Sequence, residues 1–419
     1  MNRKIEQKYR KTKGLFGKEI KIPEGWEILQ LKDCCEILDS KRIPLNSDKR
    51  KKMQGDIPYY GVNGIVDYVN DYIFDEDVVL LAEDGGYFNE YQTRPIAQFV
   101  IGKSWVNNYV HVLKNKFEYN LKFIFYSLVH KNIIRWISGS TRTKLNQKAL
   151  KKIKIFIPES DREQQKIASI LSNVDALIES TQNVIEKTEM LKKGLAQQLL
   201  TKGIGHKKFK KIKWLFRKEI EIPEEWEILQ LNDVGELIGG GTPYSKNQEY
   251  WNGKILWAVP TDITRLTTNF IDDTERKISR KGLDESSAKL LPVGSIMITS
   301  RATIGECAIN TKPLATNQGF QSLVCNAYND NLFWLYSIQY HKKLLLHASY
   351  GTTFLEISKN ALGKISIPSP KLKEQQKIAS ILSGVDAYIQ NKQEYKEKLE
   401  KLKKGLMQKL LTGQIRVKV

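Results

Sequence analysis

Two segments of the chain repeat apolar residues at spacings of three, four and seven. The first segment has them at positions 167, 170, 174, 177, 184, 191 and 195, and the second at 378, 381, 385, 388, 395, 399, 402 and 406. This spacing is typical of the seam of a coiled coil. It predicts two long helices, over residues 159–203 and 371–415, each entered just after a proline, Pro158 or Pro370.

The length of these helices bears on how they pack. Residues 163–200 alone would form a helix of roughly 57 Å, at about 1.5 Å per residue. Because such a helix outruns a small domain, we expect the two helices to pack against each other, antiparallel, with a globular domain at each far end. In the alternative arrangement, each long helix only covers its own domain.

Shorter apolar runs outside the helices indicate strands. Trp26 and Ile28 alternate with Glu27 in a run that ends at Leu31, and the same run returns from Trp226. This alternation favours a strand that enters a small domain, with the tryptophan in the core. Further strands are predicted at 78–82, as a pair around Gly102 within 96–114, at 253–260, 293–300, 153–157 and 365–367, with helices at 121–136 and 331–345.

Several blocks of the sequence occur twice. Residues 15–31 return as 215–231 with 14 of 17 identical, residues 163–178 return as 374–389, and residues 191–201 return as 402–412. The inserts between these blocks, at roughly 32–148 and 232–360, do not align. One scaffold with two different inserts is expected of a protein that recognises two unlike halves of one target.

The repeat divides the chain into six predicted segments with an overall α+β fold and a pseudo-twofold internal repeat. Each domain has about 140 residues, enough to bury its own core. We expect a basic N-terminal arm at 1–20, globular domains at 21–158 and 221–370, long spacer helices at 159–203 and 371–415, and a basic linker at 204–220.

The chain is strongly basic. It has 67 Lys plus Arg residues against 47 Asp plus Glu, which gives a net charge of +20. A charge of this size indicates a polyanionic partner such as nucleic acid, although it could also serve solubility alone. The basic segment 201–213 is open to two interpretations, a contact with the DNA backbone or a solvated linker.

The cysteine pattern and the hydropathy of the chain indicate its cellular compartment. The 4 cysteines form no C-x-x-C pair, so we expect neither a zinc site nor a disulfide framework. The charged N-terminus is followed by no apolar stretch, and no run is long enough to span a bilayer. These features predict a cytoplasmic protein.

Known catalytic motifs are missing. The Gly-Lys-Ser at 102–104 resembles the end of a phosphate-binding loop, but Ala97 stands where that loop needs glycine. The 5 histidines form no H-x-x-x-H pair, so we expect no metal ligand set. A base methyltransferase would need a cofactor loop and a short Asn/Asp-Pro-Pro-aromatic run, and the sequence contains neither. We therefore predict a chain that binds nucleic acid without catalysis and without a cofactor of its own.

Both inserts carry residue types that contact DNA. Arg and Lys pair with guanine, Asn and Gln pair with adenine, and Ser and Thr bind phosphates. The candidates lie in polar, turn-rich stretches, each of which could equally be an ordinary surface loop. In the first insert they are Lys41, Arg42, Tyr60, Asn63, Arg94, Lys103, Asn107 and Asn108, and in the second Thr242, Tyr244, Ser245, Lys246, Asn247, Ser300, Arg301, Thr303, Asn317 and Gln318.

The chain resembles the specificity (S) subunits of type I restriction-modification systems. The resemblance rests on the tandem EQQKIASILS-x-VDA helices, the LKKGL-x-Q-x-LLT helix ends and the IPE-x-WE entry strands, and it covers nearly the whole chain. The first insert's LLAEDGGY and WVNNYVHVL and the second's SRATIG and ATNQGFQSL are similar to two types of target-recognition domain.

The resemblance implies that DNA recognition and catalysis lie on different subunits. Each target-recognition domain would read one half of a bipartite, asymmetric site in double-stranded DNA, and the helices would set the gap between the halves. Two methyltransferase (M) subunits, with restriction (R) subunits in the full complex, would perform the reactions and bind S-adenosylmethionine and ATP. The helix residues expected to bind these partners are Ile167, Ile170, Val174, Leu191, Ile378, Ile381, Val385 and Leu402.

Two other classes of function remain open. The chain could be a self-sufficient nuclease or methyltransferase with an unrecognised site. It could also be a coiled-coil assembly scaffold whose charge is incidental.

Overall fold

The computed structural model describes residues 9–13, 19–116, 118–139, 142–214, 219–351 and 355–418. The chain forms two compact units, unit 1 with residues 1–180 and 396–419 and unit 2 with residues 181–395. Much of the predicted arm at 1–20, and residues 215–218 of the predicted linker, lie outside the described residues. Within the described ranges, no helix is both long and apolar enough to cross a membrane.

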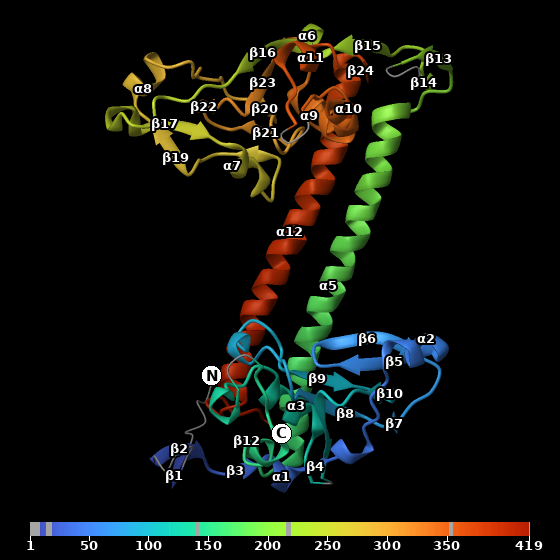
Figure 1. Cartoon of the computed structure of the whole chain (residues 1–419), viewed down its shortest axis with the longest axis vertical. Coiled ribbons are helices and arrows are strands. Elements are labelled where there is room, and N and C mark those ends of the chain that lie inside the picture. Colours follow the sequence, from blue (N-terminus) through green and yellow to red (C-terminus); the bar gives the residue numbers. More distant parts are fainter. Residues whose placement is uncertain are drawn as a thin grey trace. The chain divides into compact units, whose positions relative to one another are not determined.

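Two long helices pass through both units (Figure 1). Helix α5 (Asp161–Lys202) begins in unit 1 and ends in unit 2, and α12 (Leu372–Leu410) begins in unit 2 and ends in unit 1. The two predicted helices are therefore present, but the second ends earlier than expected. Gly203 and Gly413, with φ angles of 66° and 68°, follow the two helix ends, in the left-handed conformation that glycine adopts most easily.

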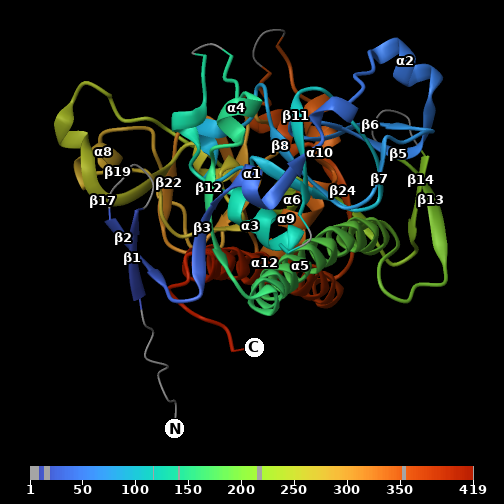
Figure 2. The ribbon, with the colours of Figure 1, turned by 90° about the horizontal axis from the view of Figure 1, so that it is seen from below.

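Unit 1 holds a mixed α+β domain. Its strands are β1 (Tyr9–Lys13), β2 (Glu19–Pro23), β3 (Trp26–Gln30), β4 (Cys35–Ile37), β5 (Gln54–Gly61), β6 (Gly64–Val69), β7 (Phe74–Asp75), β8 (Val78–Ala82), β9 (Ala97–Val100), β10 (Lys103–Val106), β11 (Val110–Asn115) and β12 (Lys154–Pro158), and its main short helices are α1 (Leu31–Cys34), α2 (Ser47–Lys52), α3 (Leu121–Val129) and α4 (Gln147–Leu150). Strands β5 and β6 and helix α2 lie together in both views (Figures 1 and 2).

Unit 2 holds a second α+β domain. Its strands are β13 (Phe209–Lys213), β14 (Glu219–Pro223), β15 (Glu227–Gln230), β16 (Gly235–Gly239), β17 (Trp251–Ala258), β18 (Phe270–Ile271), β19 (Arg276–Ile278), β20 (Ile296–Thr299), β21 (Cys307–Asn310), β22 (Leu314–Thr316), β23 (Phe320–Cys325) and β24 (Ser366–Ser369). Its helices, besides the α5 and α12 segments, are α6 (Leu231–Val234), α7 (Pro260–Thr264), α8 (Arg280–Asp284), α9 (Asn331–Tyr340), α10 (Lys342–His347) and α11 (Lys359–Gly363).

The two inserts share one topology although their sequences do not align. The central sheet of unit 1 has the order β4-β11-β8-β9, and that of unit 2 has the order β16-β23-β20-β21, extended by β18. A second sheet joins β5 to β6 antiparallel and to β10 parallel, just as β17 joins β19 antiparallel and β22 parallel. Residues in equivalent loops of the two units can therefore be compared directly.

One strand prediction was wrong. Strands β9 and β10, on either side of Gly102, were expected to pair with each other, but they belong to different sheets. β9 pairs with β8, and β10 pairs with β5 and β7. The short connection at Gly102 carries the chain from the central sheet to the second sheet.

The entry strand of each domain pairs with the strand that leads into a long helix. β3 pairs antiparallel with β12, and β15 pairs antiparallel with β24. Trp26 and Trp226, predicted to be core residues, are both fully buried. Trp26 packs edge-on against Phe123 of α3, with ring centres 6.2 Å apart. This pairing closes each domain at the place where its helix begins.

The apolar seam predicted for the long helices is only partly buried, with Ile167, Val174, Ile378 and Leu399 buried and the other positions half-buried or exposed. Leu171 and Leu382 are fully buried, whereas Leu191, Ile381 and Leu402 are 57%, 41% and 50% exposed. Each helix packs against its own domain as well as against the other helix, so Leu171 and Leu382, which lie beside the predicted seam, face inward too. Ile167 and Ile378, predicted to bind partners, are fully buried in the cores of their own units and are not available to another protein.

The helix segments are joined by the same crossed contact in each unit. In unit 1 the Asp175 carboxylate of α5 lies 2.5 Å from Lys403 Nζ of α12 and accepts a hydrogen bond from Tyr126 Oη at 2.7 Å. In unit 2 Asp386 of α12 lies 2.5 Å from Lys192 Nζ of α5 and accepts from Tyr336 Oη at 2.7 Å. The repeated VDA and LKKGL motifs therefore bind each other across the repeat.

The repeated Glu-Gln pair at the start of each long helix has a matching role. Glu163 is 1% exposed and forms two bonds of 2.6 Å with Arg416, which follows α12. Glu374 accepts from His206, which follows α5, at 2.9 Å. Together with the Lys403–Asp175 pair, the Arg416–Glu163 pair shows that the two helix segments of unit 1 run antiparallel.

Candidate nucleic-acid interface

Four connections meet at one end of the central sheet of unit 1. We call them loop cluster 1, residues 39–42, 83–87, 107–109 and 142–146. The Glu83 N–H donates to the Tyr109 carbonyl at 2.9 Å, and the Leu145 N–H donates to the Glu83 carbonyl at 2.7 Å. The Asn107 N–H donates to the Tyr60 carbonyl, at the end of β5, at 3.0 Å. These bonds bring segments from distant parts of the sequence to one surface.

Unit 2 repeats these bonds in loop cluster 2, residues 240–242, 300–305, 317–319 and 355–358. The Ser300 N–H donates to the Gly319 carbonyl at 2.7 Å, and the Ile357 N–H donates to the Ser300 carbonyl at 2.9 Å. The Asn317 N–H donates to the Ala258 carbonyl at 3.0 Å. The unlike inserts therefore present their loops on equivalent backbone supports.

The turns 107–109 and 317–319 also share their internal geometry. The side-chain oxygen of the first residue accepts the N–H of the third, at 3.1 Å from Asn107 and 2.9 Å from Asn317. The middle residue, Asn108 in one turn and Gln318 in the other, is exposed. An amide side chain thus stands at the tip of the same turn in both units, and amides are the groups that pair with adenine.

The Arg42 side chain lies beneath the surface of loop cluster 1 and bonds several of its segments. Its side chain is 12% exposed, and its Nη1 lies 2.7 Å from the Glu83 carboxylate. The same atom donates to the carbonyls of Asn108 at 3.3 Å and Val110 at 2.5 Å. The Arg42 guanidinium, predicted to contact DNA, is engaged within the protein, and whether it also contacts DNA stays a prediction. Through these bonds Arg42 connects three segments of loop cluster 1.

Loop cluster 2 is held by different groups. The Thr242 hydroxyl donates to the side-chain oxygen of Gln318, and Arg301 Nη2 lies 2.9 Å from Glu356 Oε1. Gly240 permits the close approach of the two loops, because a Cβ there would stand 1.9 Å from the Asn317 carbonyl oxygen. Ala302 has a φ of 56°, an uncommon conformation for alanine that makes the turn beside Arg301 sharp.

The other predicted DNA contacts fall into two groups. Lys41, Asn107 and Asn108 lie in loop cluster 1, and Thr242, Arg301, Thr303, Asn317 and Gln318 in loop cluster 2. Ser300 also lies there, but it is 1% exposed, so its side chain cannot reach DNA and that prediction does not hold. Outside the clusters lie Tyr60 and Asn63 at the end of β5, Arg94 before β9, Lys103 at the far end of β10, and Tyr244, Ser245, Lys246 and Asn247 before β17.

Two of the outlying residues are engaged locally. Arg94 pairs with Glu90 at 3.4 Å and stacks on Tyr87, with the guanidinium carbon 3.2 Å from the ring centre. Asn247 accepts the Glu249 N–H and so caps a short helical turn. A third outlying residue, Tyr60, is partly buried, and this burial raises the pKa of its hydroxyl.

Sequence reasoning missed two residues of loop cluster 1. Tyr109 is 42% exposed at the turn beside Asn108. Arg142 lies 2.6 Å from Asp84 and has its guanidinium carbon 5.4 Å from the Tyr109 ring centre. Tyr109 could have been included as the neighbour of the predicted Asn107-Asn108 pair. Nothing in the sequence indicated Arg142, because its place depends on a contact with a residue 58 positions away.

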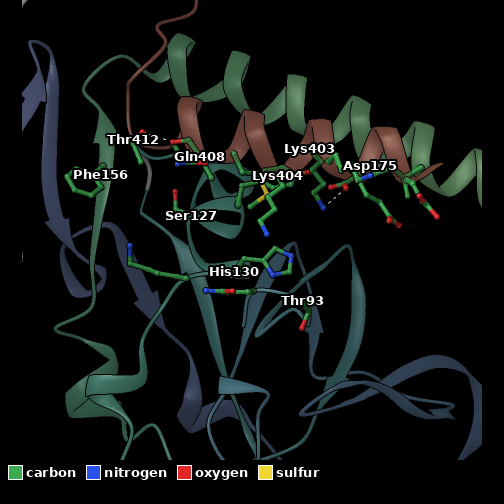
Figure 3. A pocket seen from close by; sticks show the side chains of 18 residues that line it. Thr93, Ser127, His130, Phe156, Asp175, Lys403, Lys404, Gln408 and Thr412 are labelled. Carbon is green, nitrogen blue, oxygen red and sulfur yellow. Dashed lines mark hydrogen bonds and ion pairs between the residues drawn. The ribbon is translucent and has the colours of Figure 1, made fainter. Parts of the chain in front are cut away.

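Unit 1 also contains a cavity of about 950 Å³ between its domain and its α12 segment. Figure 3 shows His130 and Thr93 on one side of the cavity and Lys404 and Gln408 on the other, with the Asp175–Lys403 pair at its edge. Lys131, which follows α3, also lines the cavity. In unit 2 the residue at the same place relative to the start of α9 is His341, and Trp214 packs edge-on against it at 5.4 Å. The cavity lies beside the helices and does not include the loops of cluster 1.

Comparisons with known proteins agree with this geometry. Residues 23–190 and 223–401 match the family described as type I restriction modification DNA specificity domain. The chain is 31% identical to the putative type I restriction enzyme MjaX specificity subunit of Methanocaldococcus jannaschii, over 99% of this chain and 98% of that protein. It is 39% identical to the MjaIX specificity subunit of the same organism, over 43% of each chain.

A solved structure has the same fold. The S subunit of a type I restriction-modification system from M. genitalium superposes with a TM-score of 0.61 and 16% identity, over 92% of this chain and 96% of that one. The match of the family to both repeats, and the identity over nearly the full length of the MjaX subunit, extend the likeness from fold to sequence. The chain therefore belongs to the family of type I restriction-modification DNA specificity subunits.

Proposed function

We propose that the chain reads a bipartite, asymmetric site in double-stranded DNA, with loop cluster 1 on one half and loop cluster 2 on the other. The observation that carries this proposal is the pair of equivalent turns, which present Asn108 in one unit and Gln318 in the other on the same backbone support. The supports are alike and the surrounding side chains differ. Two domains of one topology can therefore approach DNA alike and prefer different bases.

The chemistry of the loops suits base reading. Exposed amides at Asn108 and Gln318 would pair with adenine edges in the major groove. Arg301, 47% exposed on its side chain, can reach a guanine edge while Glu356 holds it. The exposed lysines of α2 and the net charge of +20 would supply phosphate contacts, which position the protein without reading sequence.

The long helices would serve as spacer and as docking surface. Helix α5 has 42 residues, and at about 1.5 Å per residue it is roughly 63 Å long. One heptad stripe of α12, with Ile381, Tyr388, Tyr395 and Leu402, is between 41% and 50% exposed. A line of exposed apolar residues at heptad spacing on an otherwise polar helix suits the binding of helices from another protein. Two methyltransferase subunits would dock there.

Catalysis would belong to the partner subunits. Methyltransferase subunits would bind S-adenosylmethionine and modify adenine, and restriction subunits would join them to cleave DNA with ATP. The chain itself would contribute sequence choice and spacing. We assign it no catalytic residue, cofactor or metal.

Exchange of one insert tests the proposal. Residues 32–148 are replaced by the corresponding insert of another specificity subunit, and the chain is assembled with its methyltransferase subunits. Mapping of methylated adenines across a genome should show a change in only one half of the recognised sequence. The reciprocal exchange of residues 232–360 serves as the matched control and should change only the other half. A change in both halves after either exchange would contradict the division between the two units.

A second experiment tests the spacer. Residues 183–186 and 392–395 are removed together, because these segments lie opposite each other if the Asp175–Lys403 and Asp386–Lys192 pairs keep their register. The helices shorten by about 6 Å, which is close to two base pairs of DNA. The unread gap should shorten by about two base pairs while both halves stay the same. An unchanged gap would mean that the helices do not set it.

A further inference from the structure

A buried cluster of charged groups lies beneath loop cluster 1. His111, on β11, is fully buried, and its Nδ1 lies 2.7 Å from Asp39 Oδ2. Its Nε2 lies 2.7 Å from the Leu145 carbonyl oxygen. Glu83 Oε2 lies 3.7 Å from Nδ1, and Arg42 bonds Glu83 from the other side. Each of the loop segments that meet at this surface thus contacts the cluster directly or through Arg42.

The hydrogen bonds fix the protonation state of His111. A carbonyl oxygen can only accept, so Nε2 must carry a proton. Asp39 Oδ2 also accepts from Gln147, and Asp39 Oδ1 accepts the Val112 N–H. Because both oxygens of Asp39 accept hydrogen bonds and the Arg42 guanidinium lies 3.7 Å from Oδ2, Asp39 is an ionised acceptor, and Nδ1 must carry a proton too.

His111 is accordingly held as an imidazolium in the interior. The charged groups that face it are Asp39 and Glu83, with Arg42 beside both, and Lys144, which lies 3.7 Å from Glu83. Among the described residues, Asp39, Glu83 and His111 are close enough together to hold a metal ion. The Arg42 guanidinium and the His111 protons already balance both carboxylates, so this cluster is better described as an ion-pair network.

The described residues of unit 2 form no such network at the equivalent place. The registers of the central sheets align Asp39 with Gly239 and His111 with Gln321. Neither residue of unit 2 is charged, and loop cluster 2 is held by Thr242 and by Arg301 with Glu356 instead. The two halves of the protein therefore fix their loops by different chemistry.

We propose that His111 is a positioning residue for base reading by unit 1. This inference rests on the proposed function. As an imidazolium, His111 joins Asp39 to Leu145 and thereby holds the turn after β4 against the segment before α4. Arg42 extends this contact to the Asn108 carbonyl, and so fixes the turn that presents the Asn108 amide. Loss of the His111 charge frees this turn without touching loop cluster 2.

The test compares His111→Gln with the unaltered chain, each assembled with its methyltransferase subunits. Binding is measured to the recognised DNA and to DNAs with single changes in either half. His111→Gln should lower affinity for the recognised DNA about 10- to 100-fold and reduce discrimination in the first half only, since a misplaced base-reading side chain loses about 1–3 kcal/mol per pair. His130→Gln, at a part-buried histidine of unit 1 outside the cluster, is the matched control and should leave discrimination unchanged.

Two further measurements separate positioning from a merely structural role. In the chain labelled with ¹⁵N-histidine, a signal with both ring nitrogens protonated should be present at neutral pH, and His111→Gln should remove that signal. A neutral tautomer at His111 would overturn the proposal whether or not the variant folds. Asp39→Asn combined with His111→Gln should lose no more first-half discrimination than the worse single variant, and full additivity would also overturn it.

The failure of this inference and of the proposed function can be told apart. If the unaltered chain discriminates in both halves and His111→Gln discriminates as well as it does, only the role of His111 is lost. If His111→Gln weakens both halves equally, the effect is global and the positioning role is again refuted. If exchange of residues 32–148 changes neither half, the proposed function itself fails.

Discussion

Replacement of Asp386 by Asn should destabilise unit 2 through loss of one negative charge. Asp386 Oδ2 accepts from Tyr336 Oη at 2.7 Å and from Asn269 Nδ2 at 2.9 Å, and Oδ1 lies 2.5 Å from Lys192 Nζ. Burial and the Asp386 carboxylate both raise the pKa of Tyr336, which keeps its hydroxyl a donor. All of these partners therefore donate to the carboxylate, and an amide at position 386 can accept through only one oxygen.

The size of this destabilisation follows from the number of bonds that the Asp386 carboxylate makes. A hydrogen bond to a charged group contributes about 1 kcal/mol more than one between neutral groups, and Asp386 accepts two from neutral donors. The Lys192 pair adds about 1 kcal/mol at most, because both side chains are more than a quarter exposed. Asp386→Asn should therefore lower the free energy of unfolding by about 2–3 kcal/mol.

Calorimetry of the full chain checks this expectation. The midpoint temperature of the unfolding transition of unit 2 should fall by about 5–10 °C. Asp175, the equivalent carboxylate of unit 1, has no amide donor like Asn269 among the described residues, so Asp175→Asn should cost about 1–2 kcal/mol in the transition of unit 1. Glu179→Gln, at an exposed position of α5, should change neither. A loss below about 0.5 kcal/mol for Asp386→Asn would refute the claim that this carboxylate joins the helices to the domain.

Three further predictions concern stability. Arg416→Ala should cost about 3–5 kcal/mol in urea unfolding, because it leaves the buried Glu163 charge without a partner, and Arg416→Lys should recover part of that loss. Burial lowers the pKa of His341 to about 4, although its bond to Ser337 opposes this. The neutral form is therefore the folded one, and unit 2 should lose up to about 3 kcal/mol as the pH falls from about 6.5 to about 4, a dependence that His341→Gln should flatten. Trp214→Ala should cost about 2–3 kcal/mol in the same unit, measured by calorimetry, because it removes the contact with His341 and the Nε1–H bond to the Ser366 carbonyl.

Local patterns predicted the elements of the frame well. The strand at 78–82 has the predicted bounds, and the two long helices begin within a few residues of their predicted starts. Trp26 and Trp226 are core residues, as expected from their position in an alternating run. These features depend on near neighbours in sequence, so periodicity and capping residues are sufficient to find them.

The candidate interface was harder to predict because exposure there depends on distant residues. Arg42 and Ser300 have residue types that bind DNA, yet Arg42 is used by Glu83 and the Ser300 side chain is buried. The shared topology of the inserts was hidden for a related reason. A strand requires only that its apolar and polar positions suit the sheet, and many unlike sequences meet that condition.

The helix seam shows a third kind of limit. Apolar residues at heptad spacing predict that a helix binds something, but they do not say which of its faces is covered. Here Leu171 and Leu382 face inward, and the stripe with Ile381 and Leu402 faces outward. The motifs that join the repeats are charged, and the residues of the Glu163–Arg416 pair are 253 positions apart in sequence. Because these motifs occur twice, the sequence indicates that they matter, but it does not show which residues they contact.

The crossed contacts explain why the frame repeats while the inserts vary. Arg416, from the second repeat, completes unit 1 by neutralising Glu163, and Lys192, from the first repeat, completes unit 2 by pairing with Asp386. A change in either motif alone would leave a carboxylate without its partner in the opposite repeat, so the motifs of the two repeats must remain matched. The loop clusters contribute none of these contacts. Their residues can therefore change without loss of the frame, provided that each insert supplies its own support, as the His111 network does in unit 1.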